Sequence, residues 1–409
     1  MFRKILSSSF IVSAAFLLTM CGEADNPQAE MNQFVSIFDN NQFNAGFNPV
    51  DMLQTADGGY VVLAEEKVTD TTEIPNIYLL KADKYGNFVK ELELGDTLIN
   101  PVGKLSLIND KLYFFCMVSV VKANGKDARL ASVDVNLDGF KTTNVSGITY
   151  PAAASLALSG NQFVLLSYNI DDKVSVISTV TTEGAVTASK SYTVGEGDNS
   201  EEPILNHFLR TGTQFPFDVG QLAGGIYYFN GFWNYTFSLV FTDLNPDNKE
   251  PVGYVNGYND KGGFSALVPL SASKYAAARF NFGNNYFLPN LSLAATEKKN
   301  ADQLGGLTLL ELIDNTKVKI LRATLNGKNV LIYGADTQTR QIGLYFYNEA
   351  DGAFIGSRYL GFSNPFQIGS LIATEDGGVA VCGITYLAGR FPRICIFKLS
   401  KEEVASNVK

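Results

Sequence analysis

Two nearly identical stretches lie near opposite ends of this chain of 409 residues: Thr55-Ala56-Asp57-Gly58-Gly59-Tyr60-Val61-Val62 and Thr374-Glu375-Asp376-Gly377-Gly378-Val379-Ala380-Val381. Each stretch precedes an apolar segment that ends in lysine, which reads Ile77-Tyr78-Leu79-Leu80-Lys81 in the first case and Ile394-Cys395-Ile396-Phe397-Lys398 in the second. One supersecondary unit therefore occurs at least twice. Such copying at a fixed spacing is typical of solenoids and propellers.

The unit can be followed between these two copies as four strands joined by turns that are rich in Asp, Asn and Gly. The turn after the third strand reads Asp83-Lys84-Tyr85-Gly86-Asn87 in the first unit and Asn136-Leu137-Asp138-Gly139 in the second. We predict seven units, each of roughly 45 to 55 residues, a length that suits one propeller blade. They span residues 49–95, 101–147, 151–195, 215–257, 263–313, 317–361 and 365–400.

This pattern predicts an all-β fold, namely a seven-bladed β-propeller of four-stranded antiparallel blades. Apolar residues alternate with period 2 in segments such as Tyr113 to Val121, and no stretch shows a helical stripe. The last unit lacks an obvious fourth strand, whereas residues 33–38 before the first unit form an isolated one. We expect the two to pair, so that an N-terminal strand closes the ring and leaves no free edge. The propeller then covers residues 33–400, and residues 401–409 form a C-terminal tail.

The repeat resembles that of bacterial seven-bladed propellers whose copies carry a threonine, a DGG turn, an apolar strand and a lysine-ended strand. The resemblance covers most of residues 33–400 and is strongest in the first and last units. WD40 proteins carry a tryptophan-aspartate and a glycine-histidine signature in each blade, and this chain differs from them because it contains only one Trp and one His. Some residue types of the aspartate box of sialidases also occur in Thr55-Ala56-Asp57-Gly58-Gly59. It lies between the first and second strands, however, where we expect a hairpin turn.

The N-terminal segment predicts export. Met1-Phe2-Arg3-Lys4 is followed by an apolar run from Ile5 to Met20, as in a secretory signal peptide. The sequence Leu18-Thr19-Met20-Cys21 resembles the lipobox of bacterial lipoproteins, although Met20 stands where that family usually has a small residue. The resemblance implies a signal peptide over residues 1–20, a lipid on Cys21, a polar tether over residues 21–32, and anchoring in the outer membrane with possible exposure at the cell surface. Ordinary cleavage nearby is the alternative.

Charge and cysteine content exclude several classes of partner and cofactor. The net charge is −9 with 18% charged residues, which argues against nucleic acid or anionic lipid as a partner. Besides Cys21 the chain has Cys116, Cys382 and Cys395, so at most one disulfide forms among these three. A Cys382–Cys395 bridge is one option, and three buried thiols are the favoured one. No CxxC pair or Cys/His cluster is present, and we predict neither a metal nor a cofactor.

Catalytic residues are not marked by any motif. His207, the only histidine, lies in an insertion beside Glu201 and Glu202, but no Gly-x-Ser-x-Gly accompanies it. Asp171 and Asp172 lack the spaced ligands of a calcium loop, so a solvated turn is favoured there. A pair of carboxylates for glycoside cleavage would have to come from 41 acidic residues, none of which stands out.

Aromatic residues gather in the loops expected at one face of the ring, often beside Asn or Arg. Such side chains suit carbohydrate stacking or a protein contact, because they combine a large apolar area with polar edges. The alternative is that many of them pack between blades. A single tryptophan also argues against a quinone-binding propeller. The candidate binding residues are Phe232, Trp233, Tyr235, Tyr258, Tyr286, Arg390, Phe391 and Arg393.

These observations predict a non-enzymatic surface or outer-membrane lipoprotein whose propeller face binds a protein partner or a glycan or peptide ligand. The alternative is a glycoside hydrolase or lyase with carboxylates in the propeller channel. A pocket on the propeller axis that contains two carboxylates roughly 5 to 10 Å apart would favour the enzyme. A flat aromatic face would favour the binding protein.

Overall fold

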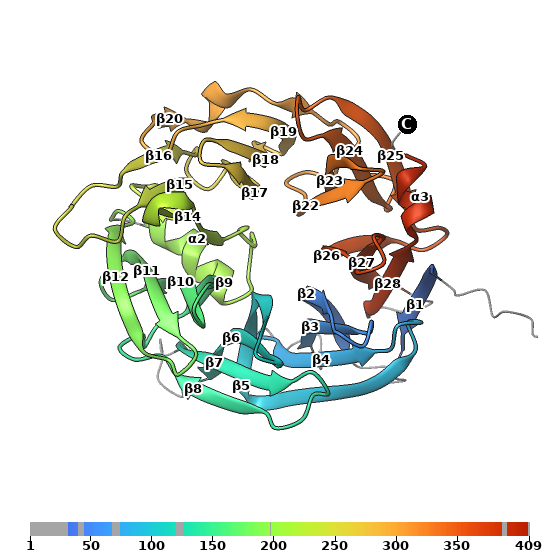
Figure 1. The fold of residues 1–409 in the computed structure, drawn as a ribbon. Helices are drawn as coiled ribbons and strands as arrows, with labels where there is room; N and C mark the ends of the chain where they lie inside the picture. The colour runs from blue at the N-terminus through green and yellow to red at the C-terminus, as the bar shows by residue number, and fades with distance from the viewer. Residues whose placement is uncertain are drawn as a thin grey trace, which may run out of the picture. The chain divides into compact units, whose positions relative to one another are not determined.

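The computed structural model describes residues 32–39, 45–67, 74–119, 126–196, 198–386 and 391–407. The fold is that of the unit Gln33–Lys409. It is almost entirely β, and its strands form six hydrogen-bonded sheets that follow one another in a ring (Figure 1). The expectation of an all-β, propeller-like fold is confirmed, because all but one of the strand pairings are antiparallel and four of the sheets have four strands.

The first and last parts of the chain share one sheet, and residues 46–144 form a seven-stranded sheet. The first sheet contains β1 (Phe34–Phe38), β26 (Phe366–Ala373), β27 (Val379–Thr385) and β28 (Arg393–Leu399). The seven-stranded sheet contains β2 (Gly46–Gln54), β3 (Tyr60–Lys67), β4 (Asn76–Ala82), β5 (Phe88–Ile108), β6 (Lys111–Ser119), β7 (Lys126–Asp134) and β8 (Lys141–Asn144).

The remaining four sheets follow in chain order around the ring. One contains β9 (Ala152–Leu158), β10 (Gln162–Asn169), β11 (Val174–Thr181) and β12 (Val186–Thr193). The next contains β13 (Asp218–Gln221), β14 (Tyr227–Trp233), β15 (Thr236–Thr242), β16 (Gly253–Asn256) and β20 (Lys298–Asn300). The last two contain β17 (Gly262–Ser271), β18 (Lys274–Asn281), β19 (Asn284–Ser292) and β21 (Leu307–Thr308), and then β22 (Val318–Leu325), β23 (Lys328–Asp336), β24 (Ile342–Asn348) and β25 (Phe354–Leu360).

The repeated turn has a definite hydrogen-bonded structure. Thr55 Oγ1 and the Gly59 amide both donate to Oδ1 of Asp57, at 2.5 and 3.0 Å. Gly58 supplies the left-handed backbone conformation, with a φ of 80°. Lys81, at the end of β4, places its Nζ 3.0 Å from the second oxygen of Asp57. The DGG motif is therefore a hairpin turn that the lysine-ended strand locks from the side, as predicted.

The second copy repeats this arrangement group for group. Thr374 Oγ1 and the Gly378 amide donate to Oδ1 of Asp376, at 2.5 and 3.0 Å. Lys398, at the end of β28, lies 2.8 Å from Oδ2 of the same carboxylate. The threonine, the aspartate, the glycines and the distant lysine therefore form one structural unit, which explains why they recur together.

Sheet packing explains the apolar runs of the central strands. Along β27, Val379 and Val381 join a core cluster with β23 and β24, whereas Ala380 and Cys382 join a cluster with β3 and β4. Successive side chains of a strand point to opposite faces. A strand that lies between two packed sheets is therefore apolar at every position, and β27 is buried throughout.

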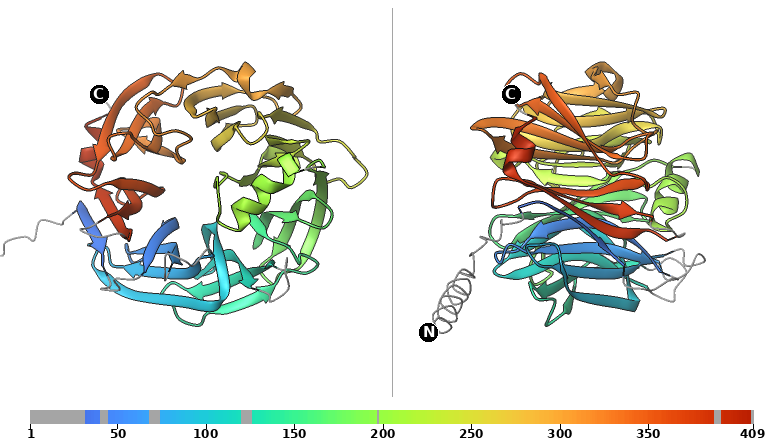
Figure 2. Two further views of the ribbon diagram at one scale, coloured as in Figure 1. Left: turned by 180° about the vertical axis from the view of Figure 1, so that it is seen from behind. Right: turned by 90° about the vertical axis from the view of Figure 1, so that its right-hand side faces the viewer.

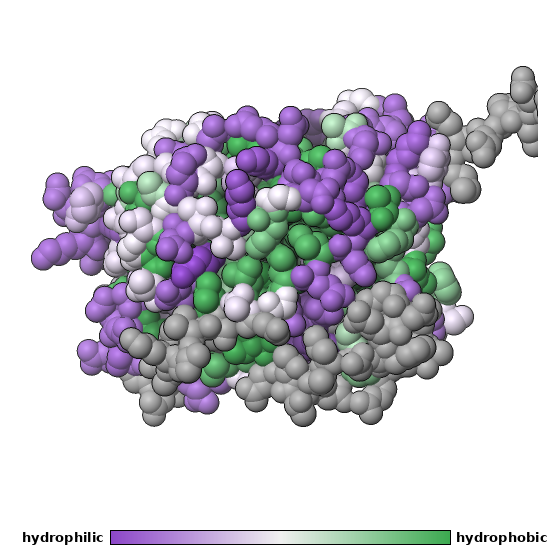
Figure 3. All heavy atoms as spheres, turned by 90° about the horizontal axis from the view of Figure 1, so that it is seen from below, coloured by the Kyte–Doolittle hydropathy of each residue, from purple (hydrophilic) through white to green (hydrophobic). Residues whose placement is uncertain are grey.

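The outer strands have one solvated side, so their burial alternates. In β12 and β25 exposed positions alternate with less exposed ones over most of the strand. One outer side of the ring, viewed in Figure 3, mixes hydrophilic and hydrophobic areas, and grey residues cover part of it. This alternation is the period-2 pattern that predicts strands.

Two short helices depart from the expectation of a chain without helical stripes. The helix α2 (Asp198–Phe208) lies in the insertion before β13, where Ser200, Ile204, His207 and Phe208 are buried at helical spacing. The helix α3 (Lys401–Ala405) occupies the segment expected as a tail, with Val404 fully buried against the sheet of β22 to β25. Short 3₁₀ turns also occur at Ala223–Gly225 and Ala301–Leu304. The stripe in α2 spans little more than two turns, which made it easy to miss.

The N-terminal strand pairs as expected. Residues Phe34–Phe38 run antiparallel to β28, with Phe34 opposite Lys398 and Phe38 opposite Ile394. The first described strand thus becomes the edge of the sheet that contains the last one, and the two lie side by side in both ribbon views (Figure 2).

Candidate functional site

The innermost strand of each repeated unit faces a cavity of about 1000 Å³ at the centre of the ring. Its walls come from β2, the second half of β5, β9, β13, β17, β22 and β26. Each of these strands begins a unit that runs from the centre outwards, as Figure 1 shows. A cavity of this size accommodates a ligand of a few sugar rings, since pockets for small molecules typically measure about 300–1,000 Å³.

Charged side chains are concentrated in this cavity. Its lining includes the cations Lys67, Lys104, Arg210, Lys317 and Lys319. The carboxylates are Asp51, Glu65 and Asp218. Cations therefore outnumber carboxylates in the cavity, although the whole chain carries a net charge of −9.

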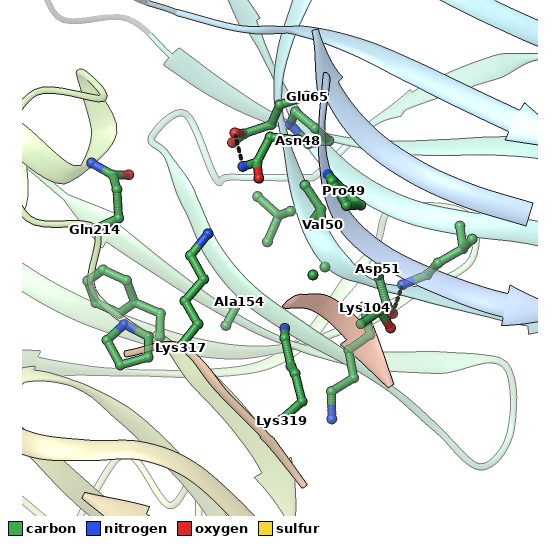
Figure 4. A pocket seen from close by; sticks show the side chains of 18 of the residues that line it. Asn48, Pro49, Val50, Asp51, Glu65, Lys104, Ala154, Gln214, Lys317 and Lys319 are labelled. Carbon is green, nitrogen blue, oxygen red and sulfur yellow. Dashed lines mark hydrogen bonds between the residues drawn. The ribbon is translucent and has the colours of Figure 1, made fainter. Parts of the chain in front are cut away.

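Asp51 is held by its own sheet and by the sheet that contains β26. Its Oδ2 accepts the Leu105 amide of β5 at 2.9 Å, and its Oδ1 accepts Ser370 Oγ of β26 at 2.7 Å. These bonds connect three innermost strands and fix the carboxylate in the wall of the cavity (Figure 4). The carboxylate is therefore preorganised, and it needs no rearrangement to face a ligand.

Asp218, the first residue of β13, differs from Asp51 in its environment. Its side chain is half-buried and lines the cavity. Burial raises the pKa of this carboxyl above its ordinary value, and the nearby charge of Lys104, the Val219 amide and the charge of Lys319 offset part of the effect. Asp218 therefore holds a proton more readily than an exposed aspartate.

Lys319 lies within electrostatic reach of both carboxylates. Burial lowers the pKa of its ammonium, Asp51 and Asp218 oppose the shift, and Lys317 and Lys104 add to it. Five charged groups from β2, β5, β13 and the start of β22 thus act on one another in the cavity. Asp51 and Asp218 both act on Lys319 and both line the cavity, although 167 positions separate them in the numbering of the chain.

A polar network forms another part of the cavity wall. Arg210, just after α2, pairs with Glu65 of β3 at 2.5 Å and donates to Gln214 Oε1 at 2.7 Å and to Asn100 Oδ1 at 3.2 Å. Asn48 of β2 donates to the other oxygen of Glu65 at 3.0 Å. The network fastens the insertion that carries α2 to the seven-stranded sheet. Glu65 and Arg210 satisfy each other and are less free to act on a ligand.

His207 also borders the cavity, but it has a structural role. The Phe215 amide donates to its Nδ1 at 3.0 Å, and the rings of Phe208, Phe215 and Phe217 pack around it. Burial lowers the pKa of the imidazole well below its ordinary value, and Arg210 and Lys317 lower it further. The ring is therefore neutral, with its proton on Nε2, and it cannot serve as a charged acid at neutral pH.

Two of the predicted binding residues are buried, which corrects their assignment. Phe232 is 1% exposed and packs edge to face on Phe215 and Phe237 at 4.9 and 5.3 Å. Arg393 is 6% exposed and donates to Asp39 Oδ1 at 2.9 Å and to the Ala45 carbonyl at 2.6 Å. Both contribute to the internal structure: Phe232 fills the core, and Arg393 ties β28 to the chain between β1 and β2.

The other predicted binding residues are dispersed. Trp233 packs on Tyr254, and the guanidinium of Arg279 covers the ring of Tyr286 at 3.9 Å. Tyr235 and Tyr258 are 51% and 57% exposed, and neither lines the cavity. Phe391 does line it.

Two predicted residues are not described. Arg390 and Cys21 lie outside the described residues, so a role of Arg390 in binding and the lipidation of Cys21 stay predictions.

Sequence reasoning missed the charged residues of the innermost strands, although a signal was present. Asp51, Lys104, Asp218 and Lys319 each lie two or three positions after the predicted start of a unit. Equivalent positions of a repeat occupy equivalent places in a ring, so charges at these positions converge on the axis. Comparing the units position by position would have found them.

Metal and thiol sites add nothing to the cavity. Among the described residues, no group of three or more His, Cys, Asp or Glu side chains could hold a metal ion. Cys116, Cys382 and Cys395 are free and buried, as the favoured reading expected. The turn at Asp171 and Asp172 is exposed and held by Asn169, whose side chain bonds to both residues.

Within the part of the chain that the structure describes, no helix is long and apolar enough to span a membrane.

Comparison with known proteins finds similarity at the level of structure. The chain matches no protein-family model and no curated protein. It is similar to a Penicillium chrysogenum α-L-arabinanase complexed with arabinobiose, with 11% identity, coverage of 88% of this chain and 94% of that one, and a TM-score of 0.46. It is also similar to the NanB sialidase of Streptococcus pneumoniae, with 9% identity, coverage of 90% and 70%, and a TM-score of 0.47. It is similar as well to an α-L-arabinofuranosidase of Fusarium graminearum, with 11% identity, coverage of 91% of this chain and 99% of that one, and a TM-score of 0.44.

These comparisons correct the expected function. The three structures named above are those of glycoside hydrolases, and the expectation of a non-enzymatic binding protein is not kept. They agree better with the alternative reading, a glycoside hydrolase or lyase with carboxylates in the channel. At this identity the likeness concerns the fold, so the chemistry has to be argued from the cavity itself.

Proposed function

We propose that this protein cleaves glycosidic bonds, with its active site in the central cavity. The observation that carries the proposal is that two unlike carboxyl groups line this cavity. Burial raises the pKa of Asp218 above its ordinary value, and Asp51 is held by two hydrogen bonds. Glycoside hydrolases need this combination: one carboxylic acid that donates a proton and one carboxylate that acts opposite it.

In hydrolysis, Asp218 gives its proton to the glycosidic oxygen as the bond to the anomeric carbon breaks. The developing positive charge on the sugar ring is stabilised by the Asp51 carboxylate. A water molecule then adds to the anomeric carbon and loses its proton to a carboxylate, so that atoms and charge balance. The hydrogen bonds from Leu105 and Ser370 keep Asp51 in place during this step.

The test is turnover of a panel of neutral and acidic oligosaccharides and polysaccharides, arabinobiose among them. New reducing ends without new ultraviolet absorbance indicate hydrolysis, and absorbance from an unsaturated product indicates a lyase. Replacing Asp218→Asn should lower kcat by at least about 100-fold, in line with the loss of a general acid. Asp247→Asn is the matched control, because Asp247 is exposed in a loop outside the cavity. Failure of the whole panel, or full activity of the Asp218 variant, would refute the proposal.

We also propose that the ring consists of seven four-stranded blades. The seven-stranded sheet divides naturally within β5, because residues up to Ile99 pair with β4 and residues from Leu98 onwards pair with β6. Counting these two halves separately yields seven units. The pairing of β1 with β28, together with contacts of β2 with β5 and β26, supports closure through the N-terminal strand.

For location we propose export and anchoring through a lipid on Cys21, by resemblance to the bacterial lipobox. The support is the basic start, the apolar run to Met20 and the cysteine that follows. An anchored glycosidase at the outer membrane would meet its substrate outside the cytoplasm.

A further inference from the structure

Three lysines define a second functional feature of the cavity. Lys317 and Lys319 are two positions apart in extended chain, so their side chains project to the same side of the strand. Figure 4 shows both reaching into the cavity, with Lys104 of β5 near Lys319. Their charges influence one another, because Lys317 and Lys104 both act on Lys319.

These three lysines are more exposed than Lys81 and Lys398 and differ from them in pairing. Lys81 and Lys398 each pair with an aspartate at 3.0 Å or less, and Arg210 of the same cavity pairs with Glu65. In the described part of the chain, Lys104, Lys317 and Lys319 have no ion pair within 4.0 Å and no side-chain hydrogen bond. Asp51 is already occupied by two donors, and burial raises the pKa of Asp218.

Like charges gathered in a concave site repel one another, and a cavity with low-dielectric walls concentrates their field. Such an arrangement lowers the stability of the empty protein and attracts an anion of matching size. The nearest available carboxylates do not supply that anion. The ligand therefore has to bring the negative charge.

We propose that the substrate is an acidic glycan, whose carboxylate or sulfate group is held by Lys104, Lys317 and Lys319. This inference rests on the proposed function and specifies its substrate class. Lys104 and Lys319 both act electrostatically on Asp218, and in this proposal the glycosidic bond next to the acidic group lies beside that carboxyl. The same lysines thus select the substrate and orient it toward the proton donor.

The experiment measures binding separately from cleavage. Isothermal titration calorimetry would use the Asp218→Asn variant with oligogalacturonates, with their methyl-esterified counterparts, and with a sulfated oligosaccharide and its desulfated form. We expect the acidic forms to bind at least about tenfold more tightly than the neutral forms, since only the acidic group makes charge-assisted hydrogen bonds with the lysines. The preference should weaken as salt is raised. Preference for carboxylate or for sulfate identifies which acidic group the lysines hold.

Substitutions then assign the preference to the lysines. Lys317→Gln and Lys319→Gln should each reduce affinity for acidic oligosaccharides by about tenfold and leave the weak binding of neutral ones unchanged. Lys274→Gln, at an exposed position outside the cavity, is the control. A thermal melt of each variant verifies that it is folded.

The outcomes separate the two proposals. Tight binding of acidic glycans without turnover by the native protein supports this inference and refutes the proposed function. Turnover of neutral glycans with no preference for acidic ones overturns this inference and leaves the proposed function standing. Equal affinity of the lysine variants and the native protein for acidic glycans also overturns it.

Discussion

The contacts of single residues explain why the same residue types, which lie apart in the sequence, recur together in both copies of the repeat. Asp57 receives three different donors: a threonine hydroxyl, a glycine amide and the ammonium of Lys81. These contacts, led by the Thr55 hydroxyl, lower the pKa of Asp57 to about 2. The side chain of Lys81 is 5% exposed, so the lysine depends on this carboxylate for its charge balance.

Replacing Asp57 should therefore lower the free energy of unfolding by more than the loss of a surface ion pair would. We expect Asp57→Ala to lower the free energy of unfolding by about 2–4 kcal/mol, because it leaves Lys81 buried without a counter-charge. Denaturant titration measures the loss. Adding Lys81→Met should restore part of the stability, and a double variant no more stable than Asp57→Ala alone would argue against this explanation.

Buried carboxyl groups determine the pH dependence of stability at the same scale. Burial raises the pKa of Asp336 to about 6, and burial with the charges of Glu93 and Glu91 raises the pKa of Glu66 to about 7. Both values exceed the ordinary 3.8 and 4.5, so the folded protein binds these protons more tightly than the unfolded chain. The stabilisation is fully present below the ordinary values and is lost as pH rises through about 6 and 7.

We expect Tm to fall as pH is raised from about 5 to about 8, measured by calorimetry at constant ionic strength. Asp336→Asn should flatten part of this slope, because the amide oxygen can still accept the Ile368 amide, which lies 2.7 Å from Asp336 Oδ1. A Tm that rises over this range, or an unchanged slope in the variant, would contradict the assignment.

At the scale of elements, each central strand serves two neighbours. The two faces of β27 belong to different core clusters, so its apolar run reflects its position between two packed sheets. The edge of β28 is covered by β1, which comes from the other end of the chain. Pairing of this kind satisfies backbone groups that would otherwise template aggregation.

Removal of β1 should therefore affect solubility as well as stability. We expect a chain that begins at residue 39 to melt at lower temperature and to aggregate more readily than one that begins at residue 33, because β28 then has a free edge. Light scattering during a thermal melt compares the two. Equal behaviour would show that β1 contributes little to closure.

At the scale of the whole molecule, the ring brings together charges from distant parts of the chain. Asp51, Lys104, Asp218 and Lys319 belong to four units and meet only because the innermost strands converge. The ring also ties the chain ends together through β1 and β28, and in our proposal it is held at a membrane by the segment before residue 33.

The anchoring proposal has a direct test in bacterial cells. We expect the chain to incorporate labelled palmitate and to fractionate with membranes, and Cys21→Ser to abolish both. A substitution at Cys116, which is buried in β6, should leave labelling intact in any protein that folds. Membrane association of the Cys21 variant would point to another mode of attachment.

The sequence by itself determined the class of fold and the hairpin turn, and it favoured three buried thiols over a Cys382–Cys395 bridge. These features depend on local chemistry and on period-2 burial, which a repeat displays openly. The short stripe of α2 was missed because two turns carry little periodic signal. Phe232 and Arg393 were misassigned because exposure depends on neighbours from other parts of the chain.

Only the tertiary structure decided which charged side chains line the cavity. Lys81 and Lys398 pair with aspartates, whereas Lys319 lines the cavity, and this difference depends on how the strands assemble, on which composition is silent. Asp57 and Asp218 are the same amino acid, yet three donors lower the pKa of one and burial raises the pKa of the other. The physical reason is that local sequence sets hydrogen bonding and backbone form, whereas desolvation and charge coupling arise only once the ring has assembled.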